Sequence, residues 1–83
     1  MSAAIISNTK ESRIYIPLLN EGTPVLRPAR GRKMAGDAYR VLATPDYDPA
    51  LEEWAFPPGT VVECAWELRD GERLLVAQRR VVD

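Results

Sequence analysis

The chain has 83 residues, of which 46% are hydrophobic and 28% are charged, and its formal net charge is −1. This is the length of one small domain and the composition of a globular chain, and the near-zero charge excludes a global field that would draw the protein to nucleic acid or anionic lipid. One cysteine and no histidine exclude an internal disulfide and the commonest general base and metal ligand.

Three features of the sequence bear on where the protein is located in the cell. The N-terminus has no basic start and only a short apolar run, unlike a signal peptide, and no segment approaches the roughly 18 apolar residues of a membrane span. Together with the single cysteine, this predicts a reduced, cytoplasmic protein with no membrane association. Residues 1–11 show little pattern, so we expect a flexible N-terminal tail and a single domain at 12–83.

The first two strands are predicted from alternation and from proline. Residues 12–19 alternate apolar and other side chains with a period of two. In the second strand, 23–29, Pro24 and Pro28 lie four apart, so both missing N–H groups face the same side of the strand. We therefore expect a sheet edge on that side.

A basic, flexible loop is predicted at 30–37, followed by a third strand at 38–43 and a long loop at 45–59. Fifteen residues without regular structure are many for so small a domain. Within the long loop, Asp48 and Pro49 are suited to the N-cap and first position of a single helical turn.

Two further strands are predicted at 60–68 and 72–82, joined by a hairpin at 69–71. Five short strands, turns rich in proline and glycine, and no helix longer than one turn predict an all-β fold. The expected architecture is a small five-stranded antiparallel barrel or roll, SH3-like, with an OB-like barrel as the alternative. One face of the fourth strand is apolar along its length: Val62, Cys64, Trp66 and Leu68.

The hairpin admits two registers. A two-residue turn of Asp70 and Gly71 places Trp66 opposite Leu75, whereas a three-residue loop with a left-handed Gly71 places Trp66 opposite Leu74. A slip of one residue moves every side chain to the other face. We expect the three-residue form, which pairs apolar residues along the strand.

Four blocks of the sequence form a recognisable series: EGTPVLRPA at 21–29, YRV at 39–41, WAFPPGTVVEC at 54–64 and LLVA at 74–77. The series resembles a family of small uncharacterised bacterial β-barrel proteins with the pattern EGT-x-VWRPV, YR, YDP-x-x-E-x-WEFPPG-x-x-V-x-CE and LVA. Leu26 stands where the family tends to have Trp, and Ala55 where it tends to have Glu. The resemblance implies a small bacterial β domain and carries over no activity.

The sequence offers little for catalysis, so we assign no catalytic residue, no metal site and no cofactor. Without histidine there is no Ser/His/Asp or Cys/His set. Cys64 lies in the middle of a strand on its apolar face, which favours a buried structural thiol. The acids of the long loop are too few and too widely spaced for calcium, and we interpret them as a solvated acidic loop. These acids are Asp46, Asp48, Glu52 and Glu53.

Two surfaces remain as candidate binding sites. The first is a groove for a peptide in the long loop, although such residues also form a small core under a loop. Its residues are Tyr47, Trp54, Phe56 and Pro57. The second is a basic segment suited to phosphate contacts, although it could also be a solvated turn in which Arg27 pairs with a loop acid such as Glu53. Its residues are Arg27, Arg30, Arg32 and Lys33, with Arg40 nearby.

The sequence therefore predicts a non-enzymatic protein-interaction module that binds a protein or peptide partner through the aromatic loop or the proline-marked strand edge. The alternative is a weak RNA- or DNA-binding barrel that uses the segment from Arg27 to Lys33. We expect a monomer or a weak homodimer, because an exposed strand edge on a small barrel invites pairing.

Overall fold

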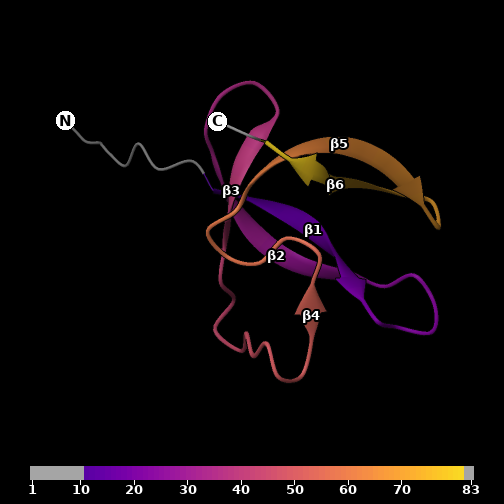
Figure 1. The fold of residues 1–83 in the computed structure, drawn as a ribbon. Coiled ribbons are helices and arrows are strands. Elements are labelled where there is room, and N and C mark those ends of the chain that lie inside the picture. The colour runs from indigo at the N-terminus through magenta and orange to yellow at the C-terminus, as the bar shows by residue number, and fades with distance from the viewer. Residues whose placement is uncertain (1–10, 82–83) are drawn as a thin grey trace.

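The computed structural model describes residues 11–81 and shows the predicted all-β fold (Figure 1). Its six strands are β1 (Glu11–Leu19), β2 (Leu26–Lys33), β3 (Ala38–Leu42), β4 (Glu53–Trp54), β5 (Val61–Arg69) and β6 (Glu72–Arg80). The short β4 was not expected. The predicted tail at 1–11 lies outside the described residues except for Glu11, and so does the expected end of the last strand at Val82.

Five of the strands form a closed ring of pairings in the order β1, β2, β3, β5, β6 and back to β1, and β4 adds to the end of β1. Each strand of the ring is antiparallel to the one before it, whereas the closing pair of β1 and β6 is parallel at Tyr15 and Val76. This follows from the odd number of strands. A fifth strand in an alternating series runs in the same direction as the first.

The core lies inside this ring and follows the period of two of the strands. The side chains with almost no exposed surface are Ile14, Ile16, Val41 and Val62, and Ala29, Tyr39, Trp54, Cys64, Leu75 and Ala77 complete the cluster. Gly31 of β2 faces the same interior. A Cβ atom at this position would lie 2.8 Å from Ile14 Cδ1 and 3.1 Å from Tyr39 Cβ, so only glycine lets the three strands approach this closely.

The predicted basic loop at 30–37 is partly wrong, because β2 continues to Lys33 and the turn covers only the remainder. The small residues at 29 and 31 provide the inward positions that extend the strand. Pro24 precedes β2, and Pro28 lies opposite Tyr15 of β1. Residues 26–29 pair with β1 alone, so the predicted sheet edge is confirmed for this half of the strand.

The preferred register of the hairpin is also wrong. Trp66 lies opposite Leu75 across a two-residue turn in which Asp70 and Gly71 have positive φ angles of 51° and 83°. Such a turn has the twist of the strands that it joins, which favours it over a longer loop. Farther along the hairpin the register shifts between the Glu63 and Cys64 pairs, which leaves Gln78 of β6 as an extra residue.

The predicted helical turn in the long loop is confirmed. The carbonyl of Asp48 accepts hydrogen bonds from the N–H groups of Leu51 and Glu52, and its Oδ1 accepts one from Ala50 N at 2.9 Å. The turn returns the chain toward the ring, where β4 pairs with the end of β1. This pairing places the Trp54 side chain in the core cluster.

Candidate functional site

The predicted aromatic site is largely interior. Trp54 is only 4% exposed and belongs to the core, and Tyr47 meets it edge to face with ring centroids 4.7 Å apart. Phe56 is half-buried against the same cluster, whereas Pro57 is exposed. The structure thus brings the three rings together, but as a cover for the core that leaves Trp54 almost no surface for a ligand.

The structure does not bring the four predicted basic residues together in one site. Arg27 is an anchor for the long loop, with Nη2 2.6 Å from Asp46 Oδ2 and Nε 3.2 Å from Glu52 Oε1. The expected pairing of Arg27 with a loop acid is therefore confirmed, although Glu53 is not the partner. Lys33 donates a hydrogen bond to Gly36 O and lies 4.8 Å from the Tyr39 ring centroid. Arg30 and Arg32 are exposed.

The acidic side chains of the long loop hold the loop in place through contacts with neighbouring segments. The Thr44 hydroxyl and the Arg27 guanidinium lower the pKa of Asp46, because both stabilise its charged form. Glu53 accepts a hydrogen bond from Asn20 Nδ2, which joins the loop to the end of β1. Within residues 11–81, no three Cys, Asp or Glu side chains are grouped so that they could hold a metal ion.

Cys64 is buried and free of any disulfide. Burial, followed by the negative charge of Asp37, raises the pKa of its thiol to about 11. The group stays protonated near neutral pH and is therefore a poor nucleophile.

A surface that the sequence analysis missed lies at the far end of the β5–β6 hairpin, which arches away from the other strands in Figure 1. Trp66 is 60% exposed and Leu68 72% exposed, on the same face of β5 as the buried Val62. The Arg73 guanidinium carbon lies 5.2 Å from the centroid of the Trp66 ring, a cation–π arrangement that holds the ring in place. We call these three exposed residues, Trp66, Leu68 and Arg73, the hairpin surface.

No local signal in the sequence marked the hairpin surface, because the order of the strands, and with it the length over which a third strand covers the apolar face, depends on pairings between distant segments. In the structure β3 pairs with β5 only at residues 61–63. The apolar row therefore continues beyond the strand that covers it.

The backbone edge beside the hairpin surface is also open. Cys64 N donates to Asp37 O at 2.9 Å, which is the last contact of this kind between β5 and the segment before β3. Because backbone groups alternate in direction along a strand, those of Trp66 and Leu68 point to the same side as those of Cys64, away from β6. In the part of the chain that the structure describes, no strand pairs with this edge from Ala65 to Arg69.

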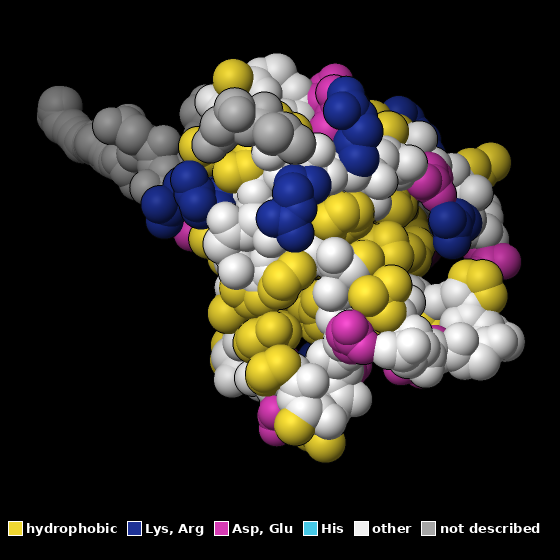
Figure 2. Space-filling view, viewed as in Figure 1, with side chains coloured by type: hydrophobic (Ala, Val, Ile, Leu, Met, Phe, Trp, Pro, Cys, Tyr) yellow, Lys and Arg dark blue, Asp and Glu magenta, His cyan; other side chains and the backbone are white. Residues whose placement is uncertain are grey.

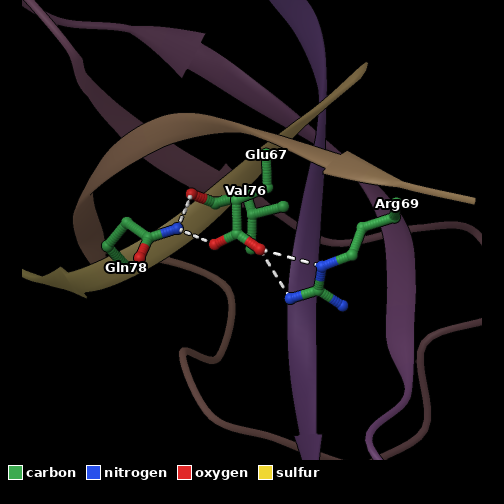
Figure 3. A network of polar contacts seen from close by, with 4 residues as sticks. All are labelled: Glu67, Arg69, Val76 and Gln78. Atoms are coloured by element: carbon green, nitrogen blue, oxygen red, sulfur yellow. Dashed lines mark hydrogen bonds and ion pairs between the residues drawn. The ribbon is translucent and has the colours of Figure 1, made fainter. Parts of the chain in front are cut away.

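The opposite face of the hairpin borders a cleft of about 300 Å³. Its floor is mostly apolar and is formed by Pro17, Leu18, Pro24, Val25, Leu26, Val76 and Ala77, with Glu67, Arg69 and Gln78 at the rim. The Glu67 carboxylate links these rim residues to one another (Figure 3). It accepts hydrogen bonds from Gln78 Nε2 at 2.5 Å and from Arg69 Nε at 3.0 Å. These two donors, Gln78 first, lower the pKa of Glu67.

Apolar side chains are also visible across the middle of the face shown in Figure 2, between the hairpin and the long loop. No helix in the part of the chain that the structure describes has the length and apolar character needed to cross a membrane. Comparison with known proteins finds no matching family model, no matching curated protein and no matching solved structure. The resemblance to the family with the WEFPPG block stays a prediction.

Proposed function

We propose that the protein is a non-enzymatic, cytoplasmic protein-interaction module that binds an extended segment of a partner along the open edge of β5. The observation that supports this most is the coincidence of a large exposed apolar pair, Trp66 and Leu68, with backbone groups on the same stretch of strand that no strand within residues 11–81 pairs with. The site proposed is the hairpin surface together with this edge, and not the aromatic loop.

The backbone supplies the first half of the recognition. A peptide added beside β5 receives main-chain hydrogen bonds from Trp66 and Leu68, as in other cases of strand addition to a sheet edge. Natural sheets usually protect such an edge with proline, charge or a covering segment. Along this edge Glu67 and Arg69 carry charge on one face of the strand, whereas Trp66 and Leu68 occupy the other face.

The side chains supply the second half. Trp and Arg are enriched among the residues that contribute most to binding at protein interfaces. Here the Trp66 ring already rests against Arg73, so little side-chain freedom is lost when a partner covers it. On the added strand, alternate side chains would lie beside Trp66 and Leu68, which favours apolar residues at every second position.

A selection of phage-displayed peptides against the whole protein tests the proposal. We expect enriched peptides with apolar residues at alternate positions, and we expect them to shift the amide NMR signals of residues 64–69. Leu68→Pro should abolish binding, because it removes an N–H that points to the open edge while the ladder with β6 stays intact. Leu51→Ala is the control, since Leu51 is 79% exposed but lies in the long loop.

The proposal is wrong if no peptide is enriched, or if the enriched peptides bind Trp66→Ala and Leu68→Pro as well as the unchanged protein. Shifts confined to the aromatic loop would contradict it too and would return the site to Tyr47 and Phe56. Thermal unfolding of each variant shows whether a loss of binding is a loss of fold.

A further inference from the structure

A positively charged surface, separate from the hairpin surface, lies on the outer face of β1, β2 and β3. Its residues are Arg13, Arg30, Arg32 and Arg40, which we call the arginine quartet. Arg30 lies directly opposite Arg13, and Arg32 directly opposite Arg40. All four are exposed. Only Arg30 and Arg32 belong to the segment that the sequence identified as basic, because the other two come from strands that pair with it.

Such an arrangement is unfavourable for the fold on its own. Like charges directly opposite each other in a sheet destabilise the pairing, and the quartet contains two such pairs side by side. Among the described residues, its ion pairs are limited to Arg30 with Glu11 at 3.4 Å. Arg40 donates to a backbone carbonyl, that of Gly59, at 3.1 Å. Arg13 and Arg32 make no ion pair among the described residues, and the contacts of Arg30 and Arg40 are exposed to water, where such contacts are weak and can be exchanged for contacts with an external anion.

The four positive charges of the quartet lie on one face of a chain whose formal net charge is −1. Most of the acids lie elsewhere, whereas at this face Glu11, which lies opposite Arg32 and contacts Arg30, offsets one of the four positive charges. Strands are about 4.8 Å apart and alternate residues about 6.7 Å apart, so the four groups form a compact cationic field. A field of this size fits several phosphates of one chain better than a single small anion.

We propose that the arginine quartet binds the sugar-phosphate backbone of single-stranded RNA or DNA, independently of the hairpin surface. Planar guanidinium groups bind phosphate in pairs of hydrogen bonds and also stack on bases. Tyr15 is the next residue beyond Arg13 on the same face of β1 and is half-buried. It supplies an aromatic ring beside the cationic field, which is the combination used by small β domains that bind single strands without sequence preference.

Arg27 and Lys33 are excluded from this site. Both alternate with Arg30 and Arg32 along β2 and so lie on the face of Ala29 and Gly31, which are buried. Arg27 is already paired with two loop acids. This distinguishes the quartet from a site formed by the whole basic segment.

Fluorescence anisotropy of a labelled oligonucleotide of about 16 nucleotides tests the quartet. Between about 50 mM and about 200 mM salt, four phosphate contacts should give a slope near −3 for the logarithm of the affinity against the logarithm of the salt concentration, since each contact to a single strand contributes about −0.7. The double variant Arg30→Gln with Arg32→Gln should reduce the slope by about 1.4 and weaken binding at low salt at least tenfold.

The matched control is Arg69→Gln with Arg73→Gln, which removes the same charge from the hairpin and should leave nucleic-acid binding unchanged. Equal loss in the two double variants, no binding at low salt, or equal binding to anionic lipid vesicles would each overturn the proposal. Far-ultraviolet circular dichroism confirms the fold of both. Peptide binding should respond in the opposite way, to the hairpin variants only, so the two proposals can fail separately.

Discussion

The ring of strands and the projecting hairpin share one row of side chains, and the two ends of that row differ completely in exposure. Val62 is fully buried and Cys64 is 3% exposed, whereas Trp66 is 60% exposed and Leu68 72% exposed. All four point to the same side of β5, and all four are apolar. The difference teaches that alternation along a strand fixes the direction of a side chain, while the neighbouring strands decide whether anything covers it.

The physical cause is the unequal length of the partners. β3 accompanies β5 only as far as Glu63, and the closing contact of the ring lies at Val76 of β6. Beyond these points the hairpin continues as two strands alone. A two-stranded ribbon has no second layer to bury its apolar face, and this makes the exposed end available to a partner.

The largest expected difference between the two regions is the cost of truncating an apolar side chain. Trp54→Ala should lower the free energy of unfolding by about 3–5 kcal/mol, because it empties a buried site in the core. Leu68→Ala should lower it by about 0.5 kcal/mol or less, because the side chain is mostly in water. Chemical denaturation followed by circular dichroism measures both.

Equal costs for the two substitutions would contradict the comparison. If Trp54→Ala left the stability unchanged, Trp54 would be free of the core, and the aromatic loop would again be a candidate binding surface.

A smaller effect is expected from the glycine at the centre of the ring. Gly31→Ala should cost about 1–3 kcal/mol, because the new Cβ would overlap the Ile14 side chain and press on Tyr39. Gly22→Ala is the matched control, since no atom lies within 4 Å of a Cβ built there. It should be neutral or slightly stabilising, because alanine restricts the unfolded chain. A similar cost at both positions would show that the ring is less tightly closed than we describe.

The smallest effect concerns Cys64, which lies at the boundary between the two regions. Its pKa is raised from 9.0 to about 11 in the folded protein, so the unfolded chain releases the thiol proton first. The thiol's contribution to stability is therefore fully present below pH 9 and is lost as the pH rises toward 11, with a slope of at most about 1.4 kcal/mol per pH unit. Urea unfolding from pH 8 to 10 gives the free energy of unfolding of the wild type and of Cys64→Ala. The difference between the two free energies, followed against pH, gives the slope that the thiol contributes. Parallel pH profiles would mean that Cys64 is as open to water as Trp66.

Local features of the sequence predicted more of the fold than of the site. The period of two located five strands, and the Asp48–Pro49 pair located the helical turn, because both depend on residues that are close together in the chain. The register of the hairpin was missed because the sequence does not show where an extra residue is accommodated. The extra residue is Gln78, outside the turn.

The candidate sites depended on pairings between distant segments. The sequence leaves Trp54 open between a peptide groove and a small core under the loop, and the pairing of β4 with β1 places it in the core. The basic segment that the sequence indicates does not include Arg13 and has Arg40 only nearby, because the register of β1, β2 and β3 is what brings these residues together with Arg30 and Arg32. The alternation of residues predicts Trp66 on a continuous apolar face. No local feature of the sequence indicates that this face extends beyond the strand that covers it.

By itself the sequence determined an all-β domain, five of its six strands, the helical turn of the long loop and the direction of the side chains along each of these strands, since these follow from alternation, turn chemistry and capping. The tertiary structure alone decided which arginines share a face, which aromatic residues are interior and which end of the β5 row meets solvent. Each of these depends on how far two strands run side by side, and that length is set by the closure of the whole ring.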